Sequence, residues 1–273
     1  MAIITIARER GAYGRIIARK LADSLDAHFI DRDIVDARLE GLGVTQKKRE
    51  AFDERKPGFF ASLTNAVEEY VTCLKLVLYE EALQGNCVIL GGGGQMLFKD
   101  VQGSLSVRLI APPEIRCQRV AEAEELDIAQ ARTVVSRVDH NREGFNNFFF
   151  DSEWANPLNY DVIFNTGDIS PEKVTMLITA MAKAIPQDEI KRGIEKLKSY
   201  TLAQKVEREI LHVKKIPVFF LNVKCKDGTV VLTGIAHSDE VIEQAKKAAV
   251  IDGVKKVVSK LEIGMHAHFD GRM

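Results

Sequence analysis

Residues 3–25, IITIARERGAYGRIIARKLADSL, decide how the first part of this chain folds. The apolar run Ile3–Ala7 predicts a short buried strand, and Ile17, Leu21 and Leu25 recur at the spacing of one helix face. A loop that contains two glycines joins the strand to the helix. Because the backbone N–H groups and the dipole of such a helix start attract negative charge, we expect an anion site at this turn.

The same alternation continues to about residue 186. Short apolar runs are separated by longer stretches with helical periodicity, which is typical of a mostly parallel sheet covered by helices on both faces. We therefore predict an α/β fold on a five-stranded parallel sheet. The expected strands are 3–7, 27–31, 87–90, 105–111 and 160–165, and the expected helices are 15–25, 59–83, 114–142 and 170–184.

A different pattern begins after Pro186. A charged helical stretch leads into two strand-like runs separated by Asp227-Gly228, a pair that predicts a hairpin. Val218, Phe220 and Val223 are expected on one side of the first run. A helix and a last strand complete a small α-β-β-α-β unit. The predicted divisions are a first domain (1–186), a linker helix (187–197), a second domain (198–265) and a tail (266–273).

The composition fits a globular protein. Charged residues make up 28% of the 273 residues and the formal net charge is -1, so no overall field attracts nucleic acid, and we expect no nucleic-acid partner. The four cysteines lack C-x-x-C spacing, which argues against a disulfide framework or a zinc site. No apolar run approaches the ~18 residues of a membrane span, and the beginning of the chain lacks the order of a signal peptide. We therefore predict a cytoplasmic location.

The glycine loop matches a nucleotide-binding pattern only in part. Against the P-loop pattern G-x-x-x-x-G-K-[ST], Glu9 takes the first glycine position, Arg15 the lysine position and Ile16 the hydroxyl position. Ile16 offers no hydroxyl to Mg²⁺, so a metal would depend on phosphates, water and a carboxylate, and we predict no protein metal site. The alternative for this segment is a tight strand-to-helix turn that needs two glycines.

Six segments, in order, give residues 1–185 a resemblance to a known family. They are ITIARERGAYGRIIARKLADSL, FIDRDIV, VILGGGG, RLIAPPEIRCQRV, RVDHNR and EWANPLNYDVIFNT. Together they resemble the cytidylate kinase-like family, relatives of bacterial CMP kinase. The resemblance implies a P-loop nucleoside-monophosphate-kinase fold, ATP with Mg²⁺, a nucleoside-monophosphate pocket and a mobile lid.

The resemblance also implies roles for residues of this chain. Phosphoryl transfer needs positive charge around the equatorial oxygens. The implied catalytic cations are Arg15 and the lid residues Arg137 and Arg142. The implied nucleotide site consists of Gly11, Ala12, Tyr13, Gly14, Arg15, Ile16, Arg116 and Arg119, and the implied acceptor site of Asp31, Arg32 and Gly92. Without the resemblance, Arg116 and Arg119 fit a solvated helix with Glu122, Glu124 and Glu125 as partners, and Asp31 or Asp33 fits a helix N-cap.

Two residues depart from the family pattern. Tyr13 stands where relatives carry a small residue, and it would crowd the phosphate loop or stack on a ligand. Gly92 stands where relatives usually carry an arginine that meets the phosphate of the acceptor. The sequence therefore predicts slow or undetectable phosphorylation of CMP together with ATP binding.

Residues 198–263 resemble the BON family through VKCKDGTVVLTG (223–234) and IDGVKKV (251–257). The resemblance implies a binding module without catalytic residues, whose partner is a phospholipid, another ligand or a protein. Five lysines would give it a basic patch, although an ordinary solvated face explains them as well. They are Lys246, Lys247, Lys255, Lys256 and Lys260.

Two functions stay open at this point. One is a nucleoside-monophosphate kinase that transfers the γ-phosphoryl group of ATP to a monophosphate acceptor, which the lid arginines favour. The other is a catalytically weak or inactive nucleotide sensor that acts through its BON-like module, which Tyr13 and Gly92 favour. The remaining features are expected to be structural: core or lid packing for 145–150 and Trp154, and a tail at 266–273 in place of a metal site at His266, His268 and Asp270.

Overall fold

The computed structural model describes residues 2–52 and 65–264. It divides into two compact units, residues 1–194 and 195–273. Helix α9 (Gln187–Arg208) runs across this division, so the predicted linker 187–197 is the first part of one continuous helix. The histidines and the aspartate of the predicted tail lie outside the described residues.

The first unit contains a five-stranded parallel sheet in the order β2-β3-β1-β4-β5, which confirms the predicted fold class. The chain leaves the central strand β1 toward β2 on one side, and it leaves the neighbouring strand β3 toward β4 on the other. The carboxyl ends of β1 and β3 therefore form a switch point, where open α/β sheets bind ligands. The strands are β1 (Ile3–Arg8), β2 (His28–Ile30), β3 (Cys87–Leu90), β4 (Ser104–Ile110) and β5 (Val162–Asn165).

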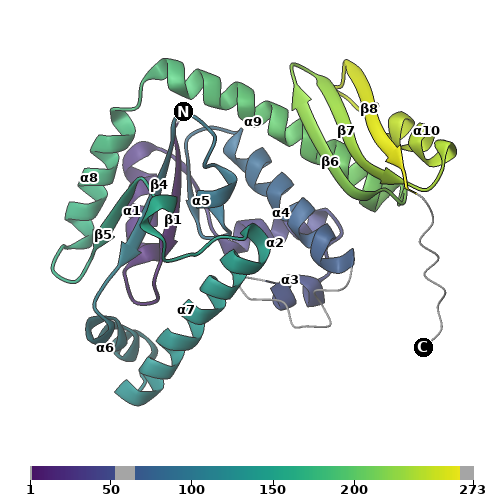
Figure 1. Cartoon of the computed structure of the whole chain (residues 1–273). Helices are drawn as coiled ribbons and strands as arrows, with labels where there is room; N and C mark the ends of the chain where they lie inside the picture. The colour runs from purple at the N-terminus through teal and green to yellow at the C-terminus, as the bar shows by residue number, and fades with distance from the viewer. Residues whose placement is uncertain (1, 53–64, 265–273) are drawn as a thin grey trace, which may run out of the picture. The chain divides into compact units, whose positions relative to one another are not determined.

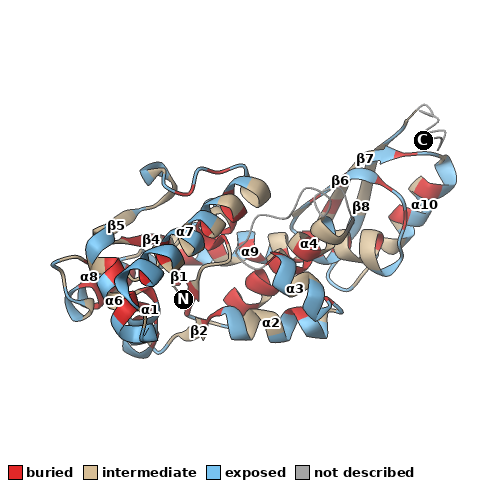
Figure 2. Ribbon diagram, turned by 90° about the horizontal axis from the view of Figure 1, so that it is seen from below, coloured by how far each residue is buried: buried red, intermediate tan, exposed pale blue. Residues whose placement is uncertain are grey.

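Helices cover both faces of this sheet (Figure 1). Helix α1 (Gly14–Leu25) packs against α8 (Pro171–Lys183) and against the sheet. Ile17 and Leu21 of α1 are fully buried in the core, as their spacing predicts, and Figure 2 shows the buried faces of the helices. Three further helices were not predicted from the sequence: α2 (Arg32–Gly41), α3 (Gln46–Phe52) and the short α5 (Gly94–Leu97). The predicted helix 59–83 is described as α4 (Asn65–Ala82), and its first residues lie outside the described part.

The prediction of one continuous helix over 114–142 was wrong, because this segment forms two helices. Helix α6 (Pro113–Glu124) ends at Glu125, which has a left-handed backbone with φ 54°. Helix α7 (Ile128–Phe150) begins after Asp127, whose carboxylate accepts from the Gln130 N–H in a capping box. The sequence pattern did not reveal this break, because both helices present apolar residues to the same small core.

The phenylalanine run at the end of α7 is packing, as expected. The Phe149 ring lies 4.7 Å from Phe145, 6.0 Å from Tyr70 of α4 and 6.4 Å from Phe52 of α3. Offset and edge contacts of this kind add to the burial of the rings. The aromatic cluster therefore ties α7 to α3 and α4.

The second unit contains a three-stranded sheet in the order β6-β7-β8. β6 and β7 form the predicted hairpin, and Asp227 and Gly228 both have positive φ, as a two-residue hairpin turn requires. β7 and β8 run parallel and are joined by α10, which Ser238 caps at the Val241 N–H. The elements after α9 are a π-helical turn (Glu209–Val213), β6 (Phe219–Lys226), β7 (Thr229–Ala236), α10 (Asp239–Ala248) and β8 (Lys256–Ile263).

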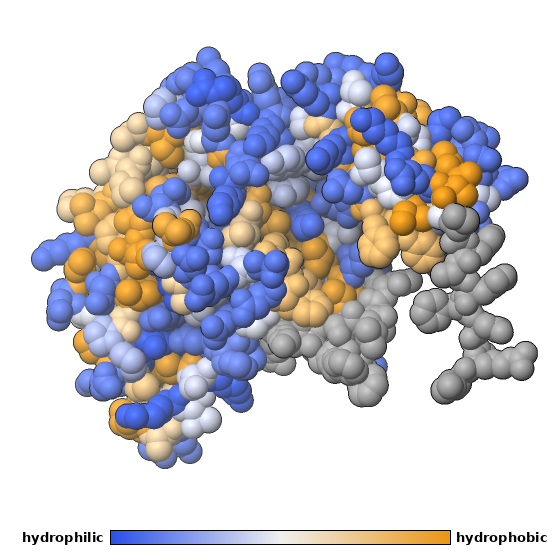
Figure 3. Space-filling model, in the orientation of Figure 1, coloured by the Kyte–Doolittle hydropathy of each residue, from blue (hydrophilic) through white to orange (hydrophobic). Residues whose placement is uncertain are grey.

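The prediction that Phe220 faces inward with Val218 and Val223 was wrong. Phe220 is 84% exposed, while the next residue, Leu221, is buried. The pairing register shifts between Phe219 and Asn222, and Phe220 has a φ of 53°, so a bulge reverses the alternation. Phe219 and Ile235 are exposed beside it, and Figure 3 shows hydrophobic side chains at this end of the sheet.

We expect residues 198–265 to fold alone. Their core includes Val206, Val230 and Leu232, all fully buried within the second unit. A unit of this size is near the limit of what one core can stabilise, so Leu232→Ala, at about 2–5 kcal/mol, should abolish the fold. The measurement is a thermal melt with an amide spectrum of the fragment. A fragment without a cooperative melt contradicts the proposed boundary.

Candidate functional site

A pocket of about 280 Å³ opens at the switch point of the first sheet. Its floor is formed by the carboxyl ends of β1, β2 and β3, and its walls by α2, α4 and α7. One part of the lining is apolar, from residues such as Val35, Leu74 and Leu78. The other part carries four arginines and two aspartates: Arg8, Arg15, Arg32, Arg142, Asp31 and Asp36. An elongated ligand with an anionic end and a flat or apolar body matches this division.

The loop between β1 and α1 is tightly packed. Gly11 has a φ of 84°, and a Cβ there would lie 2.7 Å from the carbonyl oxygen of Arg116. Gly14 is the first residue of α1, and a Cβ there would lie 2.5 Å from Cγ of Arg8. Both positions therefore require glycine, because neighbouring atoms leave no room for a Cβ. This agrees with the alternative interpretation of the segment as a tight strand-to-helix turn. Helix α1 begins at Gly14, and the next residue, Arg15, lines the pocket. The free N–H groups of the first helical turn therefore lie at the edge of the pocket.

Arg15, in the lysine position of the pattern, is paired with carboxylates. Its Nη2 lies 2.8 Å from Asp31 Oδ2 and 3.6 Å from Asp33 Oδ2. Asp31 also accepts from the backbone N–H groups of Asp33 and Ile34, so it is the N-cap of α2. The two interpretations of Asp31, cap and pocket residue, therefore hold together. Arg32, the next residue, is paired with Asp36 one turn further along α2.

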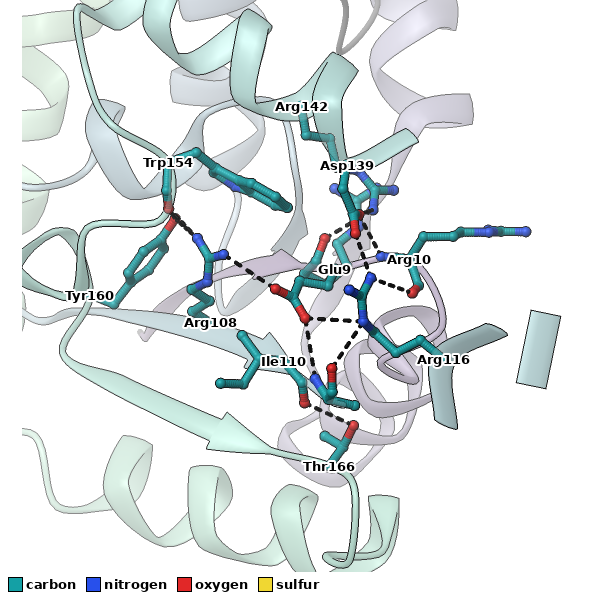
Figure 4. Close-up of polar contacts among 12 residues, drawn as sticks. Glu9, Arg10, Arg108, Ile110, Arg116, Asp139, Arg142, Trp154, Tyr160 and Thr166 are labelled. Atoms are coloured by element: carbon teal, nitrogen blue, oxygen red, sulfur yellow. Dashed lines mark hydrogen bonds and ion pairs between the residues drawn. The ribbon is translucent and has the colours of Figure 1, made fainter. Parts of the chain in front are cut away.

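Arg116 is buried beneath the loop, at the centre of a charged network (Figure 4). It donates to the carbonyl oxygens of Ala111 (2.9 Å) and Arg10 (3.2 Å) and pairs with Glu9 and with Asp139 of α7. The expected glutamate partners on its own helix are not the ones that it contacts. Its side chain therefore fixes the loop and α7 relative to each other.

Arg108 extends this network on the other side of Glu9. It lies 3.6 Å from Glu9 and stacks over the Trp154 ring at 4.4 Å (Figure 4). Burial raises the pKa of Tyr160, which the nearby Arg108 guanidinium partly offsets. Trp154, 6% exposed, is structural as expected. The P-loop pattern has a glycine at the position of Glu9. Here the Glu9 side chain instead links the end of β1 to Arg108 of β4.

Arg119 of α6 also contacts the loop between β1 and α1. It donates to the carbonyl oxygens of Gly11 (3.2 Å) and Thr166 (2.7 Å). The Tyr13 ring lies 3.8 Å from the Arg119 guanidinium and covers one of its faces. Tyr13 therefore stacks on a side chain of the protein, and its backbone is left-handed, with a φ of 57°.

The two lid arginines have different surroundings. Arg142 is buried, lines the pocket, and donates from Nη1 to the Arg8 carbonyl oxygen at 2.9 Å. Arg137 is exposed on α7 and does not line the pocket. Asp139 between them accepts from the Arg10 N–H at 2.8 Å. The structure thus brings Arg15, Asp31, Arg32, Gly92 and Arg142 together and leaves Arg137 apart.

The glycine run after β3 turns the chain sharply at the edge of the pocket. Gly91, Gly92 and Gly93 all have positive φ, between 64° and 88°. A Cβ at Gly93 would lie 2.0 Å from the Phe150 ring, whereas at Gly92 the nearest atom, a Leu78 methyl carbon, is 3.4 Å away. Gly92 therefore has room for a side chain but a backbone that disfavours one.

Arg8, like Asp36, is a charged pocket residue to which the sequence gave no role. It is the last residue of β1 and lies against Gly14 of the loop. A signal was present, because polar residues at the carboxyl end of a central parallel strand face the ligand crevice. The P-loop pattern begins only at the next residue, Glu9, so a comparison with that pattern leaves Arg8 out.

Neither the loop nor the pocket contains a built metal site. Across residues 2–52 and 65–264, no three His, Cys, Asp or Glu residues are grouped to hold a metal ion. Ile16 is 47% exposed and offers no ligand atom. The carboxylates nearest the loop, Asp31 and Asp33, are both paired with Arg15.

An α/β sheet of this order, with a glycine loop and arginines at its switch point, is a kinase-like architecture. The chain belongs to the cytidylate kinase-like family, whose model matches residues 3–168. The BON domain model matches residues 200–265, in agreement with the second unit.

Individual relatives add little on activity. An uncharacterized protein from Eubacterium ventriosum is 20% identical, with a TM-score of 0.52, over 67% of this chain and 99% of its own, which shows the fold alone. The shikimate kinase of Acinetobacter baumannii is 16% identical, with a TM-score of 0.38, over 68% of this chain and 96% of its own. The uronate isomerase of Corynebacterium glutamicum is 29% identical over 98 residues, 36% of this chain, and this match spans only 19% of the isomerase.

Among the described residues, no helix combines the length and the apolar character needed to cross a membrane.

Proposed function

We propose that the first unit is a nucleoside-monophosphate kinase that transfers the γ-phosphoryl group of ATP to a monophosphate acceptor. One observation carries the proposal: a pocket with four arginines and apolar walls lies at the switch point, directly beside the glycine loop. Membership of the cytidylate kinase-like family supports the kinase-like class.

The donor phosphates would bind at Gly11–Ile16, with Arg15 as their cation. The helix start supplies N–H groups and a favourable dipole. Arg116 and Arg119 would be positioning residues, since both donate to carbonyl oxygens of this loop. Mg²⁺ would travel with ATP, neutralise its phosphates, and find Asp31 and Asp33 as nearby carboxylates.

The acceptor would bind in the pocket near Asp31, Arg32 and Gly92, with its base between the apolar walls. Arg142 would approach the acceptor from α7, which carries the residues that the resemblance assigned to the lid. An oxygen of the acceptor phosphate attacks the γ-phosphorus, the bond from that phosphorus to the β-bridging oxygen breaks, and ADP leaves. No side chain needs to act as a strong base, because positioning and positive charge provide most of the rate.

The second candidate is a weak or inactive nucleotide sensor that signals through the BON domain. It is favoured by Tyr13, whose ring covers the face of Arg119 on which a base could stack. The exposed Phe219 and Phe220 give the second unit a surface for a phospholipid, ligand or protein partner. A cytoplasmic location stays a prediction of the sequence.

A thermal-shift panel followed by a coupled ADP assay separates the candidates. We expect ATP·Mg²⁺ at about 100 times its Kd to raise the melting temperature of the first unit by about 5 °C or more. We also expect ADP release that depends on one of CMP, UMP, AMP or GMP, with CMP turned over below the ~1–100 per second of typical kinases. Binding without ADP release supports the sensor. No shift with any nucleotide contradicts both candidates.

A further inference from the structure

Helix α8 is apolar on two opposite sides. One side packs into the core of the first unit through Val174 and Ile178, which are both fully buried. The other side carries a row of exposed apolar residues, which we call the α8 stripe. The stripe consists of Met176 (63% exposed), Leu177 (43%), Ala180 and Met181 (37%). A helix that is apolar all round is usually buried all round, so α8 has the composition of a helix that a partner covers.

The α8 stripe is continuous. Its members are separated by one, three or four positions, and residues three and four apart are neighbours on a helix surface. In Figures 1 and 2, α8 lies at the outer edge of the first unit. Single apolar residues on a surface need no explanation, whereas a contiguous apolar patch points to an interaction site.

The α8 stripe is complementary to a second copy of itself in antiparallel orientation. About a two-fold axis, the same patch of both copies meets, and each residue faces the one at the mirrored position of the other helix. With the axis midway along the stripe, Leu177 faces Ala180 of the second copy, a large side chain against a small one. Met176 faces Met181 of the second copy, and their flexible thioethers adapt to each other.

The charges beside the stripe fit the same arrangement. Glu172 and Lys183 are eleven residues apart, close to three full turns, so they lie on the same flank of α8. Met176, one turn after Glu172 and two turns before Lys183, places that flank at the edge of the stripe. In an antiparallel pair the same flanks face each other, so Glu172 of each copy approaches Lys183 of the other. The Glu172 side chain is 65% exposed and is held by Lys20 of α1 at 3.1 Å, so it remains accessible to a second copy.

We propose that this chain forms a homodimer in which the α8 stripe packs against the α8 stripe of a second copy in antiparallel orientation. A helix of 13 residues is about 20 Å long. One such helix pair buries less than the ~800 Å² per partner of a standard interface. The dimer is therefore reversible and depends on concentration. This inference does not depend on the proposed function.

Sedimentation of the full chain from about 1 μM to about 0.3 mM measures the Kd of the dimer. Met176→Glu and Ala180→Glu place a charge within the α8 stripe, and each should raise this Kd more than about tenfold. Leu158→Glu is the matched control, because Leu158 is 83% exposed on the short 3₁₀ helix Pro157–Asn159, and it should dimerise as wild type. All three positions are exposed, so the melting temperature should stay unchanged.

An exchange of charges tests the orientation. Glu172→Lys and Lys183→Glu each bring like charges together at both ends of the stripe, and each should raise the Kd about two- to tenfold. The double variant restores opposite charges and should dimerise more tightly than either single variant. In a parallel pair, neither single change would weaken the dimer in this way. The inference is overturned by a mass of one chain at every concentration, by a dimer that survives both glutamate substitutions in the stripe, or by a double variant no tighter than the single ones.

Discussion

Arg116→Met is expected to lower the unfolding free energy of the first unit by on the order of 3 kcal/mol, because it takes the nearest cation from two half-buried carboxylates and leaves two carbonyl oxygens without a donor. Glu9 and Asp139 would lose the cation between them, and the carbonyl oxygens of Ala111 and Arg10 would each lose a donor. Trp154 is the single tryptophan of the chain and lies in this network, so its fluorescence during urea unfolding reports on the first unit.

A double-mutant cycle shows whether the effect comes from the network. Asp139→Asn can still accept from the Arg10 N–H, so it removes mainly the charge. In the Arg116→Met background it should cost about 0.5–3 kcal/mol less than it costs alone. Arg132→Met, exposed on the same helix as Asp139, should change stability by no more than ~0.5 kcal/mol. Additive effects of the first two changes contradict the assignment of Arg116.

The largest effect on activity is expected for Arg15→Ala, a loss of about 10²–10³ in kcat/KM for phosphoryl transfer. Arg15 is the proposed cation for the donor phosphates, and alanine offers no replacement. ATP affinity measured by calorimetry should fall as well, while the fold persists, because the Arg15 side chain is 59% exposed. Arg15→Lys should recover part of the rate, since it restores charge without the fork.

Asp31→Asn is the control for the ion pair that Arg15 loses. Asparagine caps a helix about as well as aspartate, so α2 should keep its start. If the loss of ATP affinity in Arg15→Ala came from an unpaired Asp31, the double variant would recover that affinity, which is measured without an acceptor. We expect no recovery, and unchanged ATP affinity in Arg15→Ala would remove Arg15 from the site.

The sequence was sufficient for the sheet but not for its details. Buried parallel strands such as Ile3–Ala7 are continuous apolar runs, and their alternation with helices specified the fold class. The break between α6 and α7 depends on the left-handed backbone of Glu125. Glutamate rarely adopts this conformation, so the sequence does not predict it. The exposure of Phe220 depends on a bulge, and one extra residue in a strand reverses every later side chain.

Residues within the family motifs could be proposed for the site from the sequence. Residues whose environment depends on contacts between distant segments could not. Arg15, Asp31, Arg32, Gly92 and Arg142, which the resemblance singled out, line one pocket, while their roles stay predictions. Arg137 matches the same motif but is exposed, because it faces away from the pocket on α7. Arg116 could not be distinguished from a solvated arginine by sequence, since its partners Glu9 and Asp139 are more than twenty residues away on either side.

The central position of β1 has a consequence during synthesis. β1 ends at Arg8, and its first neighbour, β3, begins at Cys87, 79 residues later. At roughly 5–20 residues per second, the nascent strand waits about 4–16 s without a partner. Its run IITIA is apolar and β-prone, the kind of segment that aggregates while unpaired. The charged triplet Arg8-Glu9-Arg10 follows it directly, so one pocket residue and two residues of the network around Arg116 would also act as gatekeepers on the ribosome.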